Sequence, residues 1–339
     1  MSQPLLQRLK ARGEHLTVAA LPWVAPVYRV IDAVDHVIEL PFAHGRLDLA
    51  ARRRLALQWR GRFDVAYVLP NSLKSALLPW LARIPRRIGY HGESRWGLLT
   101  ERLSNPHGRP PMVAFYSALA GPLSSVDEAA RPSLVFPPNR LDALTAEHGL
   151  VAGGFFAFAP GAEYGPAKCW PAAHYASLAA GLHQRHGLPV LLLGSAKERA
   201  VCDGIAAAAE AVSPGACRVF CGSLQLIDAM GLIAAARGVA SNDSGLMHVA
   251  AAFGVPQVAM FGSTSPEHTP PLNPRAAVLW MKDELALDCA PCFDRVCRFG
   301  HTRCLTELSP QRAGQALEDM LNDASPAGRR LRQVPNLPE

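Results

Sequence analysis

The sequence lacks any apolar run long enough to cross a lipid bilayer, and its first residues, MSQPLLQRLK, lack the pattern of a signal peptide. Charged residues are scarce, at 18%, while hydrophobic residues reach 49%, which excludes a disordered chain. We therefore expect a soluble, cytoplasmic, globular protein, which can still bind a membrane at its surface. A length of 339 residues suits two domains better than one.

The sequence also lacks extended basic clusters, because its arginines are scattered and the one short run, Arg52 to Arg54, falls in a helical pattern. Nucleic acid is therefore not an expected partner. The charge is nevertheless uneven: residues 1–150 carry 19 Lys and Arg against 12 Asp and Glu, whereas the rest carry 15 against 16. A basic first half indicates an anionic small molecule or a membrane headgroup as its partner.

In the second half, short apolar runs alternate with helical patterns, which predicts a doubly wound parallel sheet. The expected strands lie within 153–161, 188–194, 218–222, 239–241 and 255–262, and the expected helices within 171–187, 196–212, 224–238 and 245–254. The first half repeats this pattern more loosely, with strands expected within 15–21, 36–41 and 63–70 and helices within 46–60 and 72–82.

Pro and Gly are concentrated between residues 105 and 138, which places a domain boundary near 135–152. We predict a first domain at 1–150, a second at 151–325 and a frayed tail at 326–339. Two open α/β domains in tandem leave a cleft, and ligands bind such sheets beyond the carboxyl ends of the strands.

The stretch SNDSGLMH (241–248) lies between an expected strand and an expected helix. One interpretation is an ordinary helix cap at Asp243. The other is an anion site, because the first turn of a helix offers free N–H groups, Gly245 leaves room for a phosphate, and Ser244 adds a hydroxyl. His248 follows one turn later, on the side able to face the cleft.

Two further loops follow expected strands of the same sheet. PGAEYGPAKCWP (160–171) carries Lys168, a point charge suited to a phosphate, and Trp170, which we expect to anchor the loop by packing. LLLGSAKE (191–198) can offer Ser195 and Glu198 to a ribose or a base, or can be a plain β-α turn.

Together these motifs resemble those of the lipopolysaccharide (LPS) heptosyltransferases, a glycosyltransferase family 9 group, and among them the ADP-heptose:LPS heptosyltransferase II type. The stretches 67–99 and 261–271 extend the resemblance over nearly the whole chain. It implies a GT-B fold, with two Rossmann-like domains facing a central cleft. It also implies inverting transfer of L-glycero-D-manno-heptose from ADP-heptose to the first heptose of the inner core on Kdo2-lipid A. No protein-bound cofactor or metal is implied, since no DxD-like carboxylate pair is evident.

The resemblance also implies roles for single residues. Lys168 would contact the diphosphate, Asp243, Ser244 and Gly245 would meet the phosphate and heptose, and His248 would support that loop. The other expected donor-binding residues are Glu163, Tyr164, Ser195, Glu198 and Leu246. Lys74, Arg87 and Arg95 of the basic first domain are expected to bind the anionic acceptor, at the cytoplasmic face of the inner membrane.

Inverting transfer needs a base for the acceptor hydroxyl, a role that in this family belongs to an Asp in a loop after the first strand. MSQPLLQRLKARG resembles the helix that follows this loop. We therefore expect the first strand of the N-terminal domain to be missing and the native product to begin about 15–20 residues before Met1. Asp32, Asp35 and Glu93 remain unassigned.

A cysteine-rich stretch, DCAPCFDRVCRFGHTRC, carries Cys289, Cys292, Cys297, His301 and Cys304. Two of the thiols form a Cys-x2-Cys pair that can bind zinc, but the spacing is not a common zinc pattern, so we expect no metal there. The functional alternatives are heptosyltransferase I or another core transferase, a sugar-nucleotide epimerase of GT-B-like architecture, and a non-catalytic nucleotide-binding module.

Overall fold

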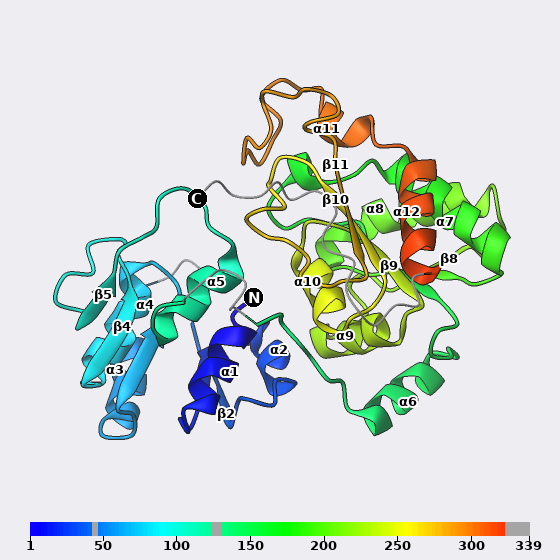
Figure 1. Ribbon diagram of the computed structural model, residues 1–339. Helices are drawn as coiled ribbons and strands as arrows, with labels where there is room; N and C mark the ends of the chain where they lie inside the picture. Colours follow the sequence, from blue (N-terminus) through cyan, green and yellow to red (C-terminus); the bar gives the residue numbers. More distant parts are fainter. Residues whose placement is uncertain (43–46, 124–129, 323–339) are drawn as a thin grey trace. The chain divides into compact units, whose positions relative to one another are not determined.

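The computed structural model describes residues 1–42, 47–123 and 130–322, and the predicted tail at 326–339 lies outside this part. The chain divides into two compact units, Met1–Ala130 and Arg131–Glu339 (Figure 1). The division comes earlier than the predicted residue 150. Helix α6 (Pro138–Glu147) belongs to the second unit because it packs on helix α9 (Leu226–Ala235), to which an Arg140–Asp228 ion pair of 3.1 Å also joins it.

Within the described residues, the second unit is built on one six-stranded, fully parallel sheet in the order β11-β10-β9-β6-β7-β8. Its strands are β6 (Phe156–Ala159), β7 (Val190–Leu192), β8 (Cys217–Val219), β9 (Gly238–Asn242), β10 (Gln257–Phe261) and β11 (Ala276–Trp280). The apolar runs predicted the first five. Strand β11 escaped prediction because it is an edge strand whose residues are mostly half-buried.

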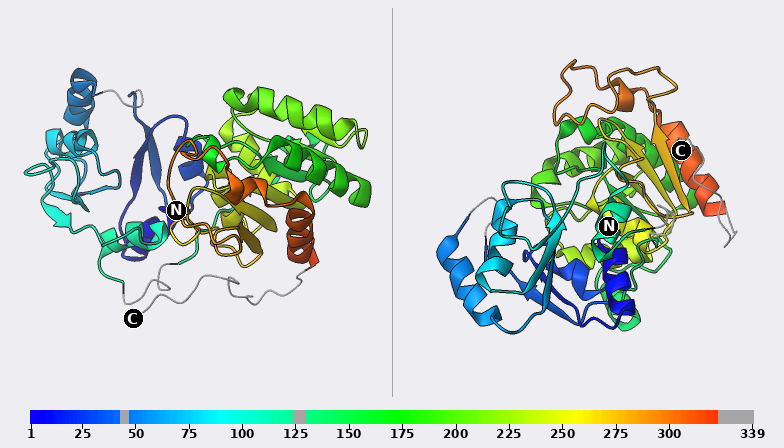
Figure 2. Two further views of the ribbon diagram at one scale, coloured as in Figure 1. Left: turned by 90° about the horizontal axis from the view of Figure 1, so that it is seen from above. Right: turned by 60° about the vertical axis from the view of Figure 1, so that its left-hand side comes forward.

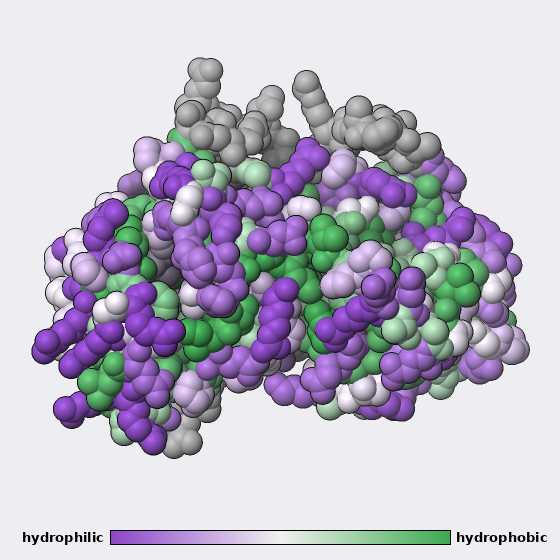
Figure 3. Space-filling model, turned by 90° about the horizontal axis from the view of Figure 1, so that it is seen from below, coloured by the Kyte–Doolittle hydropathy of each residue, from purple (hydrophilic) through white to green (hydrophobic). Residues whose placement is uncertain are grey.

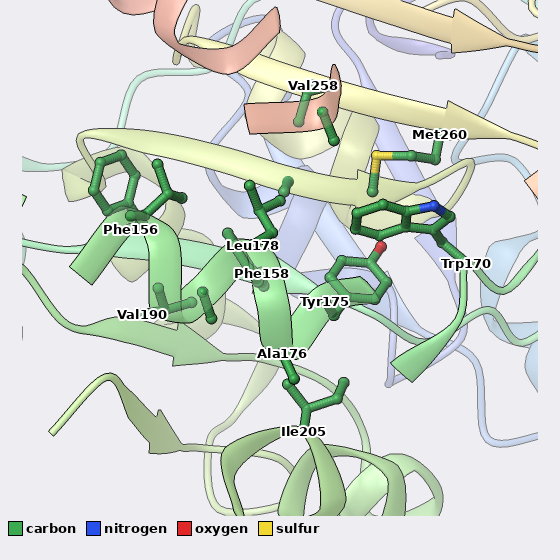
Figure 4. Packing of buried hydrophobic residues seen from close by; sticks show 14 of the residues in the cluster. Phe156, Phe158, Trp170, Tyr175, Ala176, Leu178, Val190, Ile205, Val258 and Met260 are labelled. Carbon is green, nitrogen blue, oxygen red and sulfur yellow. The ribbon is translucent and has the colours of Figure 1, made fainter. Parts of the chain in front are cut away.

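Helices cover both faces of this sheet (Figures 1 and 2). One face carries α7 (Ala172–His186), α8 (Arg199–Glu210) and α12 (Pro310–Asn322), and the other carries α9 and α10 (Gly245–Ala252). Short helices η3 (Pro166–Lys168), η4 (Ala196–Glu198) and α11 (Arg303–Thr306) lie in the connections. On the first face, Phe158, Trp170, Tyr175 and Met260 belong to one buried cluster (Figure 4). Its burial fixes α7 against the sheet.

The strand order reverses between β6 and β9. From β6 the chain proceeds through β7 to β8 on one side, then returns to β9 beside β6 and continues to β10 and β11 on the other. Parallel α/β sheets bind ligands at the carboxyl ends of the strands at such a switch point. The loops after β6 and β9 therefore flank the expected ligand position.

The first unit contains two separate parallel sheets in its described residues, one of β1 and β2 and one of β3, β4 and β5. Its elements are α1 (Gln3–Ala11), β1 (Thr17–Ala20), α2 (Ala25–Arg29), β2 (His36–Glu39), α3 (Leu49–Trp59), β3 (Val65–Val68), α4 (Leu73–Leu81), β4 (Arg86–Tyr90), β5 (Glu101–Leu103), α5 (Met112–Ser117) and η1 (Ala118–Ala120). The helical expectation for the first residues is confirmed by α1. The sequence did not predict β4, β5 or α5.

On the face drawn in Figure 3, hydrophilic and hydrophobic residues are interspersed. Among the helices that the structure describes, none combines the length and the apolar character that spanning a bilayer requires.

Candidate functional site

The two loops at the switch point are joined by a buried ion pair. Lys168 ends η3 in the loop after β6, and Asp243 directly follows β9. The Lys168 Nζ lies 2.6 Å from the Asp243 Oδ2, with the two side chains 13% and 5% exposed. A charge pair this far out of water needs further hydrogen bonds to offset its desolvation.

Hydroxyl groups from the loop after β10 supply those bonds. Thr264 Oγ1 donates to Asp243 Oδ2 at 2.7 Å, and Thr269 Oγ1 donates to Asp243 Oδ1 at 3.3 Å. The carboxylate is therefore directed toward Lys168 and the threonines, so the structure does not bear out a helix-capping role for Asp243. The residues of this cluster thus come from the loops after three neighbouring strands, β6, β9 and β10.

The start of α10 is left open for a ligand. Ser244 is the N-cap residue, yet within the described part of the chain its side chain makes no capping hydrogen bond and its buried Oγ has no partner. Gly245 is exposed, and a Cβ placed on it would meet nothing within 4 Å of the described atoms. A helix start with free N–H groups, an unused hydroxyl and open space beside a lysine favours an anion.

His248 lies near the same pair. It interacts electrostatically with both Asp243 and Lys168, and burial lowers the pKa of its imidazole below the usual value. The side chain is therefore neutral near pH 7 and does not oppose Lys168 with a second positive charge. Leu246 is half-buried on the first turn of α10.

Asn242 is the residue that sequence reasoning missed. Its buried Oδ1 accepts hydrogen bonds from the Trp170 backbone N–H and the Tyr175 hydroxyl, both at 3.0 Å. Its Nδ2 donates to the carbonyl of Pro160 at 2.6 Å. Asn242 thus binds both ends of the 160–170 loop to β9. Trp170 anchors that loop as expected, being 2% exposed and donating its Nε1–H to the Leu308 carbonyl at 2.9 Å.

The loop after β7 is a capped turn. The Glu198 Oε2 accepts hydrogen bonds from the Ser195 N–H at 2.6 Å and from its Oγ at 2.9 Å, which forms a capping box. These bonds fit the plain β-α turn, although Ser195 stays exposed. A ribose or base contact at Ser195 or Glu198 remains a prediction.

Glu163 and Tyr164 lie in the same loop as Lys168. The exposed Glu163 pairs with Lys197 at 3.0 Å. The Tyr164 ring lies 5.3 Å from the Lys168 Nζ and 5.6 Å from the Arg295 guanidinium carbon. Tyr164 therefore lies beside the site lysine, whereas Glu163 is held in a surface ion pair.

The three residues expected to bind the acceptor differ in their surroundings. Arg95 is 2% exposed, and its guanidinium donates to the carbonyls of Pro70 and Tyr90 and to Asn71 Oδ1. Arg87 donates to the carbonyl of Leu98 at 2.6 Å and to that of Ile84. Lys74 is half-buried on α4. Arg95 is thus an internal brace, and its burial disfavours the predicted contact with an acceptor.

The structure does not identify any of the three acidic residues left unassigned by the sequence as the catalytic base. The Asp35 carboxylate binds Lys10 Nζ at 2.6 Å and the Leu16 N–H at 2.7 Å, and these bonds lower its pKa to about 2. A carboxylate so acidic is a poor proton acceptor. Glu93 accepts from the Leu73 N–H at 3.0 Å, and Asp32 stays unassigned.

Comparison with known proteins identifies a common family. The family model described as glycosyltransferase family 9 (heptosyltransferase) matches residues 52–303. The lipopolysaccharide heptosyltransferase 2 of Salmonella typhimurium is 39% identical over 346 residues, covering 95% of each chain, and that of Escherichia coli is 40% identical over 297 residues, covering 82% of this chain and 83% of its own. The solved structure of E. coli ADP-heptose LPS heptosyltransferase II has a TM-score of 0.81 at 36% identity, with 94% of each chain covered.

Proposed function

This chain belongs to glycosyltransferase family 9, with the GT-B α/β fold of its heptosyltransferases, and from that membership we propose how its site works. The chain is a glycosyltransferase that moves heptose onto the LPS inner core, as its closely similar heptosyltransferase 2 relatives indicate. Its donor is ADP-L-glycero-D-manno-heptose and its acceptor the first heptose on Kdo2-lipid A. The Lys168–Asp243 pair beside the open start of α10 is the observation that carries the donor assignment.

In this proposal the diphosphate of the donor lies between Lys168 and the first N–H groups of α10. Ser244 Oγ, which is buried and without a partner among the described residues, adds a hydroxyl donor. Because Gly245 lacks a side chain and faces open space, a phosphate oxygen can approach the backbone closely. Leu246 completes the first turn beside the phosphates.

The same groups assist bond cleavage. As the glycosidic bond breaks, negative charge grows on the leaving ADP, and positive groups already aimed at that charge stabilise the transition state. Lys168 and the helix N-terminus supply such groups, and Asp243 and its threonine partners hold Lys168 in place. We further propose that the Asp243 carboxylate lies close enough to the donor heptose to accept a hydrogen bond from one of its hydroxyls.

For the acceptor we propose electrostatic attraction by the basic first unit. Lys74 is the favoured contact, since the Arg87 and Arg95 guanidinium groups already bind backbone carbonyls. We also propose that the protein works at the cytoplasmic face of the inner membrane, where its lipid-linked acceptor is held.

The test is incubation of the purified protein with ADP-heptose and heptosylated Kdo2-lipid A, with mass spectrometry of both substrates. The proposal predicts one added heptose on the acceptor and release of ADP. An acceptor lacking its first heptose is the control and should gain none. Isomerised donor without transfer would instead indicate an epimerase, and ADP binding without turnover a binding module; either result contradicts the proposal.

A further inference from the structure

Four cysteines of the second unit line one small cavity. The segment between β11 and α12 carries them, and the cavity, with a volume of about 20 Å³, is lined by Cys289, Cys292, Cys297 and Cys304 together with His301. All four are free, half-buried thiols. The volume suits one water-sized occupant, so a single ion fits it.

Three of these thiols come from irregular parts of the segment, and Cys304 lies in the short helix α11. All four cysteines line the same cavity, so their side chains surround one small space.

Residues 281–302 contain no helix or strand, although the structure describes every one of them. Loops of this length without secondary structure are uncommon unless they serve a function or are held by an added constraint. A metal ion is one such constraint, because it replaces many weak contacts by a few strong bonds.

We propose that Cys289, Cys292, Cys297 and Cys304 bind one thiophilic divalent cation. Four thiolates in tetrahedral arrangement suit zinc and ferrous iron alike. Each cysteine that coordinates the ion releases its thiol proton to solvent, and no electron is transferred. In the described residues, no three potential ligands already stand in a coordinating arrangement, so the ion draws the thiols inward from the cavity wall. This proposal replaces the sequence expectation that the cysteines bind no metal.

The segment is hydrogen-bonded to the loop that carries Lys168. The Arg295 carbonyl accepts from the Ala167 N–H at 3.1 Å, and the Arg295 Nε donates to the Tyr164 carbonyl at 2.6 Å. A Cβ on Gly165 would lie 2.4 Å from the Arg295 carbonyl oxygen, so the two backbones touch only because residue 165 is glycine. An ion bound to the cysteines therefore stiffens the loop that presents Lys168.

That coupling rests on the proposed donor site, whereas metal binding itself does not. The Tyr164 hydroxyl also donates to the carbonyl of Phe293, and the Phe293 N–H donates to the Ser263 carbonyl at 2.7 Å, in the loop after β10. Two of the three loops around Lys168 are thus fastened to the cysteine segment.

The first experiment measures metal content. The full chain is purified under reducing conditions without a metal-affinity column, and zinc and iron are measured by mass spectrometry. We expect about one metal ion per chain, lost in Cys292→Ser and Cys297→Ser and kept in Cys217→Ser, whose half-buried thiol lies on β8. Circular dichroism checks that each variant is folded.

A second measurement tests metal binding on the wild-type chain itself. It is needed if the variants fold poorly or if the ion is lost during purification. Cobalt(II) added to the metal-free wild-type chain should give thiolate-to-cobalt absorption bands, and zinc should remove them. Three results would overturn the proposal. They are the absence of these bands when cobalt(II) is added to the metal-free protein, a disulfide within 289–304, and retention of the metal by Cys297→Ser.

The coupling has its own readout. Removing the ion from the wild type with a chelator should weaken ADP binding several-fold, measured by calorimetry, and readdition of zinc should restore it. Metal bound with unchanged ADP affinity would overturn the coupling and leave the metal site standing. A protein that binds metal but transfers no heptose would contradict the proposed function alone.

Discussion

The Lys168 ammonium and the Asp243 carboxylate form an ion pair of 2.6 Å at the point where the strand order of the second sheet reverses. Neither side chain is near its partner in sequence, so the pairing is a product of the topology. It places the Lys168 ammonium beside the open start of α10. Residues from three loops, those after β6, β9 and β10, hold the ammonium in this position.

Lys168→Met and Asp243→Asn should affect ADP binding in opposite directions. Lys168→Met removes the charge proposed to meet the diphosphate, so we expect ADP affinity to fall at least about tenfold, or ~1.4 kcal/mol. It also leaves Asp243 buried without its cation, which costs about 3–5 kcal/mol of stability. Asp243→Asn frees Lys168 for the phosphates, so ADP should bind at least as tightly while heptose transfer falls.

Titration calorimetry with ADP checks both variants below their melting temperatures. Lys197→Met is the matched control, because Lys197 is 77% exposed and pairs with the surface residue Glu163. It should bind ADP normally. Equal weakening by Lys168→Met and Asp243→Asn would show that the pair acts as a structural unit and not as proposed.

Gly245→Ala should weaken ADP binding without harming the fold. The new Cβ would meet no described atom within 4 Å, so stability should stay within about 0.5 kcal/mol, as for surface substitutions. A phosphate at the α10 start would collide with that methyl group, and we expect about tenfold weaker binding. The control is Gly181→Ala in α7, where a Cβ also finds open space. It should stabilise slightly and leave ADP affinity unchanged.

Asn242→Ala should destabilise the protein and also disorder the Lys168 loop. The substitution leaves the Trp170 N–H and the Pro160 carbonyl without their buried partner, at a cost of about 1–3 kcal/mol for each group. Asn273→Ala is the matched control, because it removes a comparable buried hydrogen bond away from the site. The Asn273 side chain is buried and donates to the Val255 carbonyl at 2.7 Å. Thermal melts should show both variants destabilised, but only Asn242→Ala should bind ADP less tightly. Equal ADP affinities in the two would argue against the loop-fixing role.

Substitutions of Arg95 and Lys74 should have different effects, because Arg95 has a structural role in the first unit and Lys74 is proposed to bind the acceptor. Arg95→Met removes hydrogen bonds to Pro70, Asn71 and Tyr90, so we expect loss of stability in thermal melts. Lys74→Ala should keep stability within about 0.5 kcal/mol and raise the KM for the acceptor severalfold, with the KM for ADP-heptose unchanged. An unchanged acceptor KM in Lys74→Ala would remove Lys74 from the acceptor site.

Much of the second unit follows from its sequence. Its buried strands are short, continuous apolar runs, and Gly187 and Gly254 end their helices in the left-handed conformation at φ of 66° and 70°. Such local signals predict elements well. Gly238 was expected to end a helix but begins β9, because the chain turns at Ala236, two residues earlier.

The site was predictable in its position and only partly in its contacts. Lys168, Asp243 and Gly245 could be named because they follow strands in loops of unusual composition. What the sequence could not show is that the Asp243 carboxylate is directed toward Lys168, since that depends on Thr264 and Thr269 from the loop after β10. Asn242 was overlooked for the same reason: its partners lie at least 67 residues away in the chain.

The central claim is that the diphosphate of ADP lies between Lys168 and the start of α10. A crystal structure of the protein with ADP tests it most directly. We predict a phosphate oxygen within hydrogen-bond distance of the Lys168 Nζ and of the Gly245 N–H. ADP bound with its phosphates elsewhere, and the Lys168–Asp243 pair untouched, would contradict the account.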